Sequence, residues 1–311
     1  MSHTGAWRLI LDPFSGDEGA AASVARGASG GDASPGTPAA LPGALNMAVD
    51  EALLAGVRAG AAPVLRLYRW APACLSFGRN EPARGRYDAG AAAAEGLELV
   101  RRPTGGLAVH HAHELTYAVV GRVADLGRPR EAYLRINQAL VAALRAVGVP
   151  AELAAGAGRL SVAEAGPCFA LPAAGEVVCG GRKLVGSAQR REGDALLQHG
   201  SILLDGSQSA VTRLRVDVAA TAATRDPGAQ GAPVGWLAPS EVAASSSHGS
   251  TTVARELGRV LAPAALVEPI AVALGEALGT RFAPAPMDSP ERLRALHLLA
   301  RYRSDDWTWR R

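Results

Sequence analysis

The stretch Gly180–Gln189 reads GGRKLVGSAQ, and the prediction of the fold starts from it. Its paired glycines favour a turn, and the residues after them alternate well enough to form a strand. Strand-like segments lie on both sides, at Gly175–Cys179 and Ala195–Leu204, again separated by glycine turns. This part of the chain therefore predicts consecutive strands joined by glycine turns.

Lys183, in the same stretch, is the only lysine of a chain with 32 lysine and arginine residues. Lysine carries a compact ammonium group on a flexible stem, and its surroundings move its pKa readily. Such a group can hold a carbonyl oxygen, lower the pKa of a nearby thiol or shuttle a proton. The alternative is a surface lysine that remains by chance in a chain whose other cations are arginines. Its position in the sequence alone does not decide between these two interpretations.

Helices and further strands surround this region. The remaining predicted strands are Trp7–Leu11, Pro63–Trp70, Ala73–Gly78, Leu97–Arg102 and Ala108–Val120. The predicted helices are Ala44–Ala59, one from Pro129 to about Gly148, Pro263–Leu278, and one capped by Ser289 that runs to about Arg303. Many strands interleaved with a few long helices predict an α+β (mixed α/β) fold, with mixed and antiparallel sheets flanked by helices.

The 311 residues predict a single domain over 1–311. Residues from about 15 to 43 are rich in Gly, Ala, Ser and Pro and predict a flexible loop, and about 206–252 predicts an irregular segment. The net charge of +3 is compatible with an acidic protein partner but too weak to indicate nucleic acid. We find no signal-peptide pattern and no apolar stretch of the ~18 residues that a membrane span needs, so we expect a cytoplasmic protein with reduced thiols and no membrane contact.

Arg101–His111 reads RRPTGGLAVHH and is the first candidate site. Two cations precede the turn Thr104-Gly105-Gly106, and glycines let backbone N–H groups approach an anion or a carbonyl. A plain hairpin with solvated arginines is the simpler interpretation of this motif in isolation. The glycine pattern of dinucleotide-binding folds is absent here.

His110, His111 and His113 lie close together in the sequence. In a continuous strand His111 and His113 would share one face and His110 would point to the other. Two imidazoles on one face leave a metal short of ligands, and nothing in the sequence places His199 as a third. A role as polar lining of a site, or as buried histidines with hydrogen-bond partners, is favoured over a metal.

Cys168 lies in a segment bounded by Gly166 and by Pro167 and Pro172, where a reactive thiol is plausible. Cys74 and Cys179 lie within apolar strands and are expected to be buried and inert. A nucleophilic thiol needs a cation that favours the thiolate, and Lys183 could meet Cys168 across a hairpin.

Four segments together resemble the superfamily of lipoate–protein ligases, octanoyltransferases and biotin ligases. They are Asn46–Leu54, Arg66–Trp70, Arg101–Tyr117 and Gly181–Gln189 with Gln198–Ser201. The chain is most similar to the ligase-like octanoyl-[acyl carrier protein]:protein N-octanoyltransferases. The resemblance implies the catalytic-domain fold of the biotin/lipoate ligases and implies an enzyme, an acyltransferase.

The resemblance also implies roles for single residues. Cys168 stands where the family's cysteine takes the octanoyl group as a thioester, and Lys183 stands where its lysine lies against the carbonyl. The remaining positions would line the acyl tunnel: Arg101, Arg102, Thr104, Gly105, Gly106, His111, Gly186, Ser187 and Ala188. The implied donor is octanoyl-acyl carrier protein. The implied acceptor is a lysine of a lipoyl carrier domain, in the glycine cleavage H protein or a 2-oxoacid dehydrogenase E2, and no cofactor is implied.

Alternatives remain within this superfamily. Leu107 and Ala112 depart from the transferase pattern, and Leu107 is closer to the octanoyl amidotransferases that act between lipoyl carrier proteins. An ATP-dependent lipoate–protein ligase would use ATP and magnesium, but such ligases carry an Asn-Asp pair where this chain has Gly175-Glu176-Val177. A non-catalytic lipoyl-domain-binding protein is disfavoured by the presence of both Cys168 and Lys183. A biotin ligase is disfavoured because its glycine-rich signature is missing.

Overall fold

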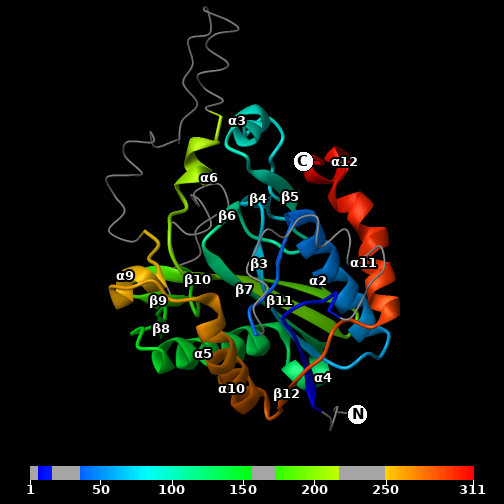
Figure 1. The fold of residues 1–311 in the computed structure, drawn as a ribbon, viewed down its shortest axis with the longest axis vertical. Coiled ribbons are helices and arrows are strands. Elements are labelled where there is room, and N and C mark those ends of the chain that lie inside the picture. Colours follow the sequence, from blue (N-terminus) through cyan, green and yellow to red (C-terminus); the bar gives the residue numbers. More distant parts are fainter. Residues whose placement is uncertain (1–5, 16–35, 156–171, 217–248) are drawn as a thin grey trace, which may run out of the picture.

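The computed structural model describes residues 6–15, 36–155, 172–216 and 249–311, and two β-sheets form its centre (Figure 1). The large sheet contains β1 (Trp7–Ile10), β2 (Ala40–Leu41), β3 (Val64–Trp70), β7 (Glu114–Arg122), β8 (Glu152–Leu153), β9 (Val177–Cys179), β10 (Arg182–Glu192), β11 (Ala195–Leu203) and β12 (Phe282–Pro284). Its order is β12-β1-β3-β7-β11-β10-β9-β8, with β2 added beside β3. The small sheet contains β4 (Cys74–Phe77), β5 (Glu98–Arg101) and β6 (Val109–His111), in the order β5-β4-β6.

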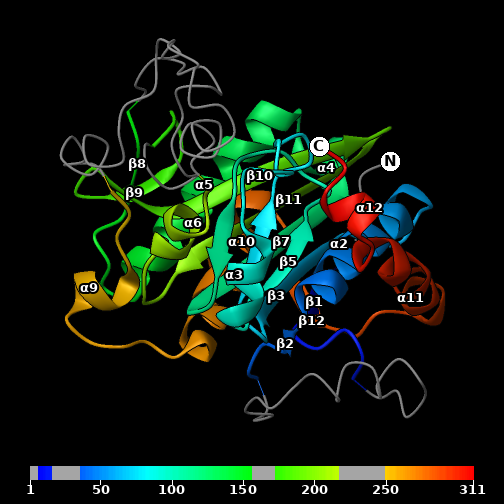
Figure 2. The same cartoon turned by 90° about the horizontal axis from the view of Figure 1, so that it is seen from above.

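Helices cover both faces of the large sheet (Figures 1 and 2). One face carries α2 (Gly43–Arg58) and α11 (Ser289–Tyr302), and the other carries α5 (Pro129–Ala146) and α10 (Val267–Leu278). The shorter helices are α3 (Ala89–Ala94), α4 (Val123–Leu126), α6 (Ser209–Arg213), α9 (Val253–Leu257), α12 (Asp305–Thr308) and the 3-10 helix η1 (Pro263–Leu266). Within the described ranges, no helix has the length and apolar character needed to cross a bilayer.

The central strands are apolar on both sides because a core lies on each face of the sheet. In β7, Leu115, Tyr117 and Val119 belong to the core beneath α5 and α10. Ala118 and Val120 belong to the core beneath α2 and α11. This alternation places successive residues of one strand on opposite faces, so polar side chains on the α2 face gather between β3, β7 and β11.

The structure confirms the mixed α/β class with mixed sheets, and it corrects several details. The predicted strand Ala108–Val120 is two strands, β6 and β7, broken at Ala112 and His113. The predicted loop contains β2, and the predicted irregular segment contains α6. The cap of α11 is Asp288 rather than Ser289, because the Asp288 carboxylate accepts from the backbone N–H of Glu291 at 2.7 Å. Other parts of those two segments, 16–35 and 217–248, lie outside the described residues.

Residues near the C-terminus hold the small sheet in place through hydrogen bonds. The Arg101 guanidinium donates to the carbonyls of Thr308 at 2.9 Å and Gly78 at 2.6 Å. The Trp307 indole N–H donates to the Arg101 carbonyl at 2.9 Å. A β-carbon at Gly78 would lie 1.7 Å from the carbonyl oxygen of Gly106, so only glycine allows the two loops to approach this closely. The turn that follows β5 is therefore held in place from both sides.

Candidate functional site

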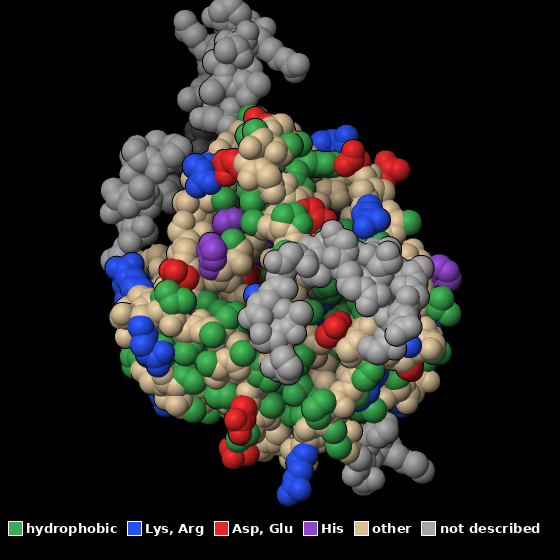
Figure 3. All heavy atoms as spheres, in the orientation of Figure 1, with side chains coloured by type: hydrophobic (Ala, Val, Ile, Leu, Met, Phe, Trp, Pro, Cys, Tyr) green, Lys and Arg blue, Asp and Glu red, His purple; other side chains and the backbone are tan. Residues whose placement is uncertain are grey.

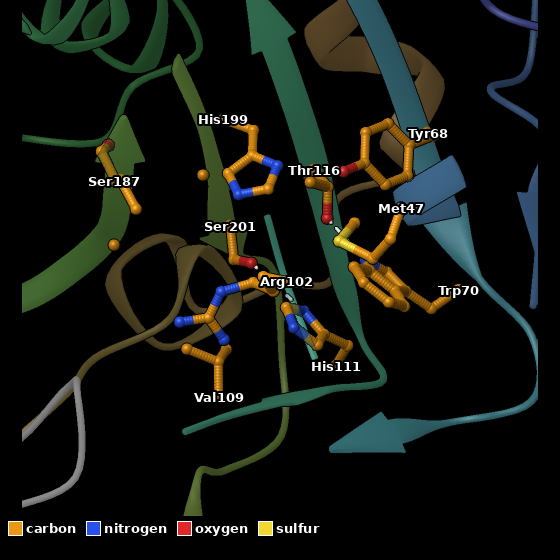
Figure 4. Close-up of a pocket in the computed structure, with 13 residues that line it drawn as sticks. Met47, Tyr68, Trp70, Arg102, Val109, His111, Thr116, Ser187, His199 and Ser201 are labelled. Atoms are coloured by element: carbon orange, nitrogen blue, oxygen red, sulfur yellow. Dashed lines mark hydrogen bonds between the residues drawn. The ribbon is translucent and has the colours of Figure 1, made fainter. Parts of the chain in front are cut away.

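A small cavity lies where the α2 face of the large sheet meets β6 of the small sheet (Figure 4). Its volume is about 30 Å³, which is room for about two water molecules. The lining residues come from α2, β3, the turn after β5, β6, β7, β10 and β11. They are Met47, Tyr68, Trp70, Arg102, Val109, His111, Thr116, Gly186, Ser187, Ala188, His199, Gly200 and Ser201.

One wall of the cavity is built on the buried carboxylate of Asp50. Asn46 and Asp50 lie four residues apart on α2 and therefore share a helix face. Arg66 on β3 donates to Asp50 at 2.6 Å and to the Asn46 side chain at 2.6 Å. The Tyr68 hydroxyl donates to Asp50 at 2.8 Å, and His199 Nδ1 lies 2.9 Å from the same carboxylate oxygen.

The charge of Asp50 is compensated inside the protein. Burial alone would raise its pKa, but the Arg66 charge, together with the hydrogen bonds from His199 and Tyr68, outweighs burial and lowers the pKa. Asp50 is therefore ionised at neutral pH and orients the imidazole of His199. The other ring nitrogen of His199 lies 2.6 Å from the Thr104 hydroxyl, which links this wall to the Thr-Gly-Gly turn.

A second wall is built on the carboxylate of Glu114. Its Oε1 accepts from Thr116 at 2.6 Å and Ser201 at 2.7 Å, and it lies 2.7 Å from His111 Nδ1. Burial would raise the pKa of Glu114, but the interactions with His111, Thr116 and Ser201 outweigh it and lower the pKa. Burial lowers the pKa of His111 against the opposing effect of Glu114, so the imidazole is neutral at pH 7. The Trp70 ring stacks on that imidazole, with ring centres 3.8 Å apart and planes 11° from parallel.

Arg102 holds the glycine turn closed beside the cavity. Its guanidinium donates to the Ser76 hydroxyl at 2.6 Å and to the carbonyls of Gly105 at 3.1 Å and Leu107 at 2.9 Å. Gly106 has a φ of +92°, a conformation that favours glycine. The sequence motif thus forms a turn whose backbone shape depends on the second of its two arginines.

The β10 side of the cavity is lined mainly by backbone and small side chains. A β-carbon at Gly200 would lie 2.4 Å from the Gly186 carbonyl oxygen, so β10 and β11 pass too closely for any larger residue there. The Ser187 hydroxyl is 2.7 Å from that of Tyr117, which also accepts from Gln198 at 2.9 Å.

Lys183 lies on β10, three positions before Gly186. Its side chain is only 2 % exposed, and its ammonium donates to Glu176 Oε1 at 2.8 Å. The other oxygen of Glu176 accepts the backbone N–H of Ala173 at 2.8 Å, so the loop before β9 fixes the carboxylate. The lone lysine is therefore a buried cation with a fixed partner, and the surface interpretation is wrong.

The structure brings together part of the predicted site. Arg102, His111, Gly186, Ser187 and Ala188 line the cavity, and Thr104 reaches it through His199. The others, Arg101, Gly105, Gly106 and Lys183, do not line it, and Arg101 is turned toward the end of the chain. Cys168 lies outside the described residues. Substrate binding by these residues stays a prediction.

Sequence reasoning did not identify Asp50, His199, Trp70 and Glu114 as parts of the site. The four-residue spacing of Asn46 and Asp50 on a predicted helix was an available signal for polar residues on one face. The shared face predicted for His111 and His113 is wrong, because the chain turns between β6 and β7 and leaves His113 exposed. Among the described residues, no group of three histidine, cysteine or acidic side chains could hold a metal ion.

The sequence of this chain matches a known protein family and named relatives. The family model of the lipoyl protein ligase A/B catalytic domain matches residues 42–242. A relative named octanoyltransferase LipM, from Moorella thermoacetica, is 38 % identical over 86 % of this chain and 93 % of its own length. A second octanoyltransferase LipM, from Kyrpidia tusciae, is 37 % identical over 86 % of this chain and 95 % of its own length.

Solved structures share the fold at much lower identity. A crystal structure of lipoate-protein ligase A bound with ATP superposes with a TM-score of 0.69 at 19 % identity, over 98 % of each chain. A bipartite lipoate protein ligase from Thermoplasma acidophilum, solved in a study that includes its E2 lipoyl domain, gives 0.68 at 20 % identity, over 98 % of this chain and 96 % of its own. At such identities the likeness establishes the fold alone.

Proposed function

This chain belongs to the lipoyl protein ligase A/B catalytic domain family, and we propose that it is an octanoyltransferase within that family. It takes an octanoyl group from octanoyl-acyl carrier protein, carries it as a thioester on Cys168, and passes it to a lysine of a lipoyl domain. The acceptor domains are those of the glycine cleavage H protein or of 2-oxoacid dehydrogenase E2. We propose a cytoplasmic enzyme that needs no cofactor.

The observation that carries this proposal is the buried ion pair of Lys183 and Glu176. Lys183 lies on β10, the strand that supplies Gly186, Ser187 and Ala188 to the cavity wall, and Glu176 lies in the loop before β9. We propose that this buried cation favours a thiolate on Cys168 and the negative oxygen of a tetrahedral intermediate. The two LipM octanoyltransferases that resemble this chain over most of their length support octanoyl transfer as the reaction.

The proposed reaction has two balanced steps. The Cys168 thiolate attacks the carbonyl carbon of the donor thioester, and the carrier leaves as a thiolate that takes up a proton. The amine of the acceptor lysine then attacks the new thioester and loses a proton, an amide forms, and the Cys168 thiolate is released. Lys183 stabilises the negative charge that develops on sulfur and oxygen.

The position of Glu176 favours a transferase over an ATP-dependent ligase. Its two carboxylate oxygens are engaged by Lys183 and by the backbone N–H of Ala173. A ligase needs polar groups at this stretch that can handle an adenylate and its metal. Here the carboxylate instead orients the cation that the transferase reaction uses.

The experiment is intact-mass spectrometry of the protein after incubation with octanoyl-acyl carrier protein without nucleotide. We expect a gain of one octanoyl group, its loss when a lipoyl domain is added, and no gain in Cys168→Ala. Cys74→Ser and Cys179→Ser are matched controls, because both thiols are buried and free in the described structure. Lipoyl-domain modification that requires octanoate, ATP and magnesium would establish the ligase instead, and transfer only from an octanoylated H protein would establish the amidotransferase.

A further inference from the structure

The cavity is too small for the group that the proposed function assigns to it. Its volume of about 30 Å³ compares with the ~150 Å³ cavity that holds benzene, a six-carbon ligand. We therefore infer that a lining residue moves when an eight-carbon acyl chain enters. The identity of the moving residue decides how long a chain fits.

Hydrogen bonds hold the polar side chains that line the cavity. Tyr68 is bonded to Asp50, Trp70 to Thr116, and His199 to both Asp50 and Thr104. The same is true of the other polar lining residues, Arg102, His111, Thr116, Ser187 and Ser201. Displacing any of these side chains breaks hydrogen bonds that are buried or, at Ser187, partly buried, which costs free energy.

Five lining residues have no polar side chain, and one of them is both large and flexible. Gly186, Ala188 and Gly200 have no side-chain torsion to turn, and Val109 is stiff because it branches at the β-carbon. Met47 has three rotatable side-chain bonds and no hydrogen-bonding requirement. It is fully buried on α2, and Figure 4 shows its side chain between those of Tyr68 and Trp70.

We propose that Met47 sets the length of the acyl chain that this protein accepts. The inference rests on the proposed octanoyl transfer and assigns a specificity-determining residue to it. The Met47 side chain lines the cavity wall and turns aside to admit an eight-carbon chain. Longer chains need the space that the Met47 side chain itself occupies, because hydrogen bonds keep the neighbouring Tyr68, Trp70 and Thr116 in place.

The test compares hexanoyl-, octanoyl-, decanoyl- and dodecanoyl-acyl carrier protein as donors, with kcat/KM for acyl-enzyme formation measured by intact mass. We expect Met47→Ala to raise the decanoyl-to-octanoyl ratio of kcat/KM by about 10-fold or more, because one or two methylene groups in a pocket change discrimination by that order. Met47→Leu conserves the side-chain volume and should therefore fold even if Met47→Ala does not. Since its branched side chain turns aside less easily, we expect the hexanoyl-to-octanoyl ratio to rise by about 10-fold.

Met287→Ala is the matched control, because Met287 is equally buried in the same core cluster but does not line the cavity. It removes the same atoms and should leave the chain-length profile of the wild type unchanged. If Met47→Ala and Met47→Leu both keep that profile, the inference is wrong while the octanoyltransferase stands. If the wild-type protein accepts no acyl chain of any length from the carrier, the proposed function itself has failed.

Discussion

Replacing Asp50 by asparagine, a side chain of nearly the same shape, should strongly destabilise the protein. Arg66 and Asp50 are both fully buried, with 2.6 Å between Nη1 and Oδ1. Removing one partner of a buried pair costs about 3–5 kcal/mol, because the other charge remains without compensation. The amide also turns a donor toward Arg66, or toward the Tyr68 and His199 donors. We therefore expect the free energy of unfolding to fall by about 4 kcal/mol, a large share of the 5–15 kcal/mol typical of a protein.

Urea unfolding followed by circular dichroism and tryptophan fluorescence measures this loss, provided that the two transitions coincide. Glu95→Gln is the control, because its ion pair with Arg213 is exposed and should contribute about 1 kcal/mol or less. Adding Arg66→Met to Asp50→Asn removes the uncompensated charge and should recover part of the loss. An Asp50→Asn protein within 1 kcal/mol of wild type would refute the reasoning.

The same pair predicts a pH dependence with a definite sign. The pKa of Asp50 is lowered in the folded protein, whereas an unfolded aspartate has a pKa of about 3.9. The contribution of Asp50 to stability is therefore complete above about pH 4 and is lost as the pH falls through the folded pKa. The difference in unfolding free energy between wild type and Asp50→Asn should shrink over that acid range, and a difference that grows on acidification would contradict it.

Two further predictions concern the proposed nucleophile and its cation. Burial raises the pKa of Cys74 well above its usual value, and burial with the neighbouring Glu256 raises that of Cys179 to about 11, so iodoacetamide at pH 8 should label Cys168 first. Peptide mapping checks this, and rapid labelling of Cys179 would contradict it. Lys183→Arg should lower the transfer rate by at least ~100-fold, because the larger guanidinium cannot occupy the 2 % exposed position beside Glu176 without displacing its surroundings. A nearly unchanged rate in a steady-state assay would show that charge alone is needed there.

Local patterns were sufficient to predict the long helices and most of the strands, but not the short elements such as β2 and α6. The apolar periodicity of α2 and α5 and the glycine-bounded alternation of β10 and β11 are properties of consecutive residues. Local patterns could not decide whether Asp288 or Ser289 caps α11, because both neighbouring residues fit the pattern of an N-cap. The structure selects Asp288 since Glu291 closes a reciprocal pair of hydrogen bonds with it.

The site could be predicted only where one motif contributes several of its residues. Arg102, His111 and Gly186 came from such motifs, and all three line the cavity. The pair of Asp50 and His199 joins residues 149 positions apart, and no local pattern connects them. Likewise, whether Lys183 is buried or exposed depends on where the loop bearing Glu176 folds back.

The hydrogen bonds that join the small sheet to the C-terminal residues also affect the order in which the site forms during synthesis. Arg101 and Trp307 are 206 positions apart, and each donates a hydrogen bond to the backbone carbonyl of the other. The residues of the glycine turn are synthesised early, but Trp307, which is hydrogen-bonded to Arg101 at the start of that turn, is synthesised about two hundred residues later. A nascent chain can therefore pair its central strands while the turn beside the cavity is still unlocked, since contacts this distant in sequence form late. The region around the cavity is therefore completed only after the residues near Trp307 have been synthesised.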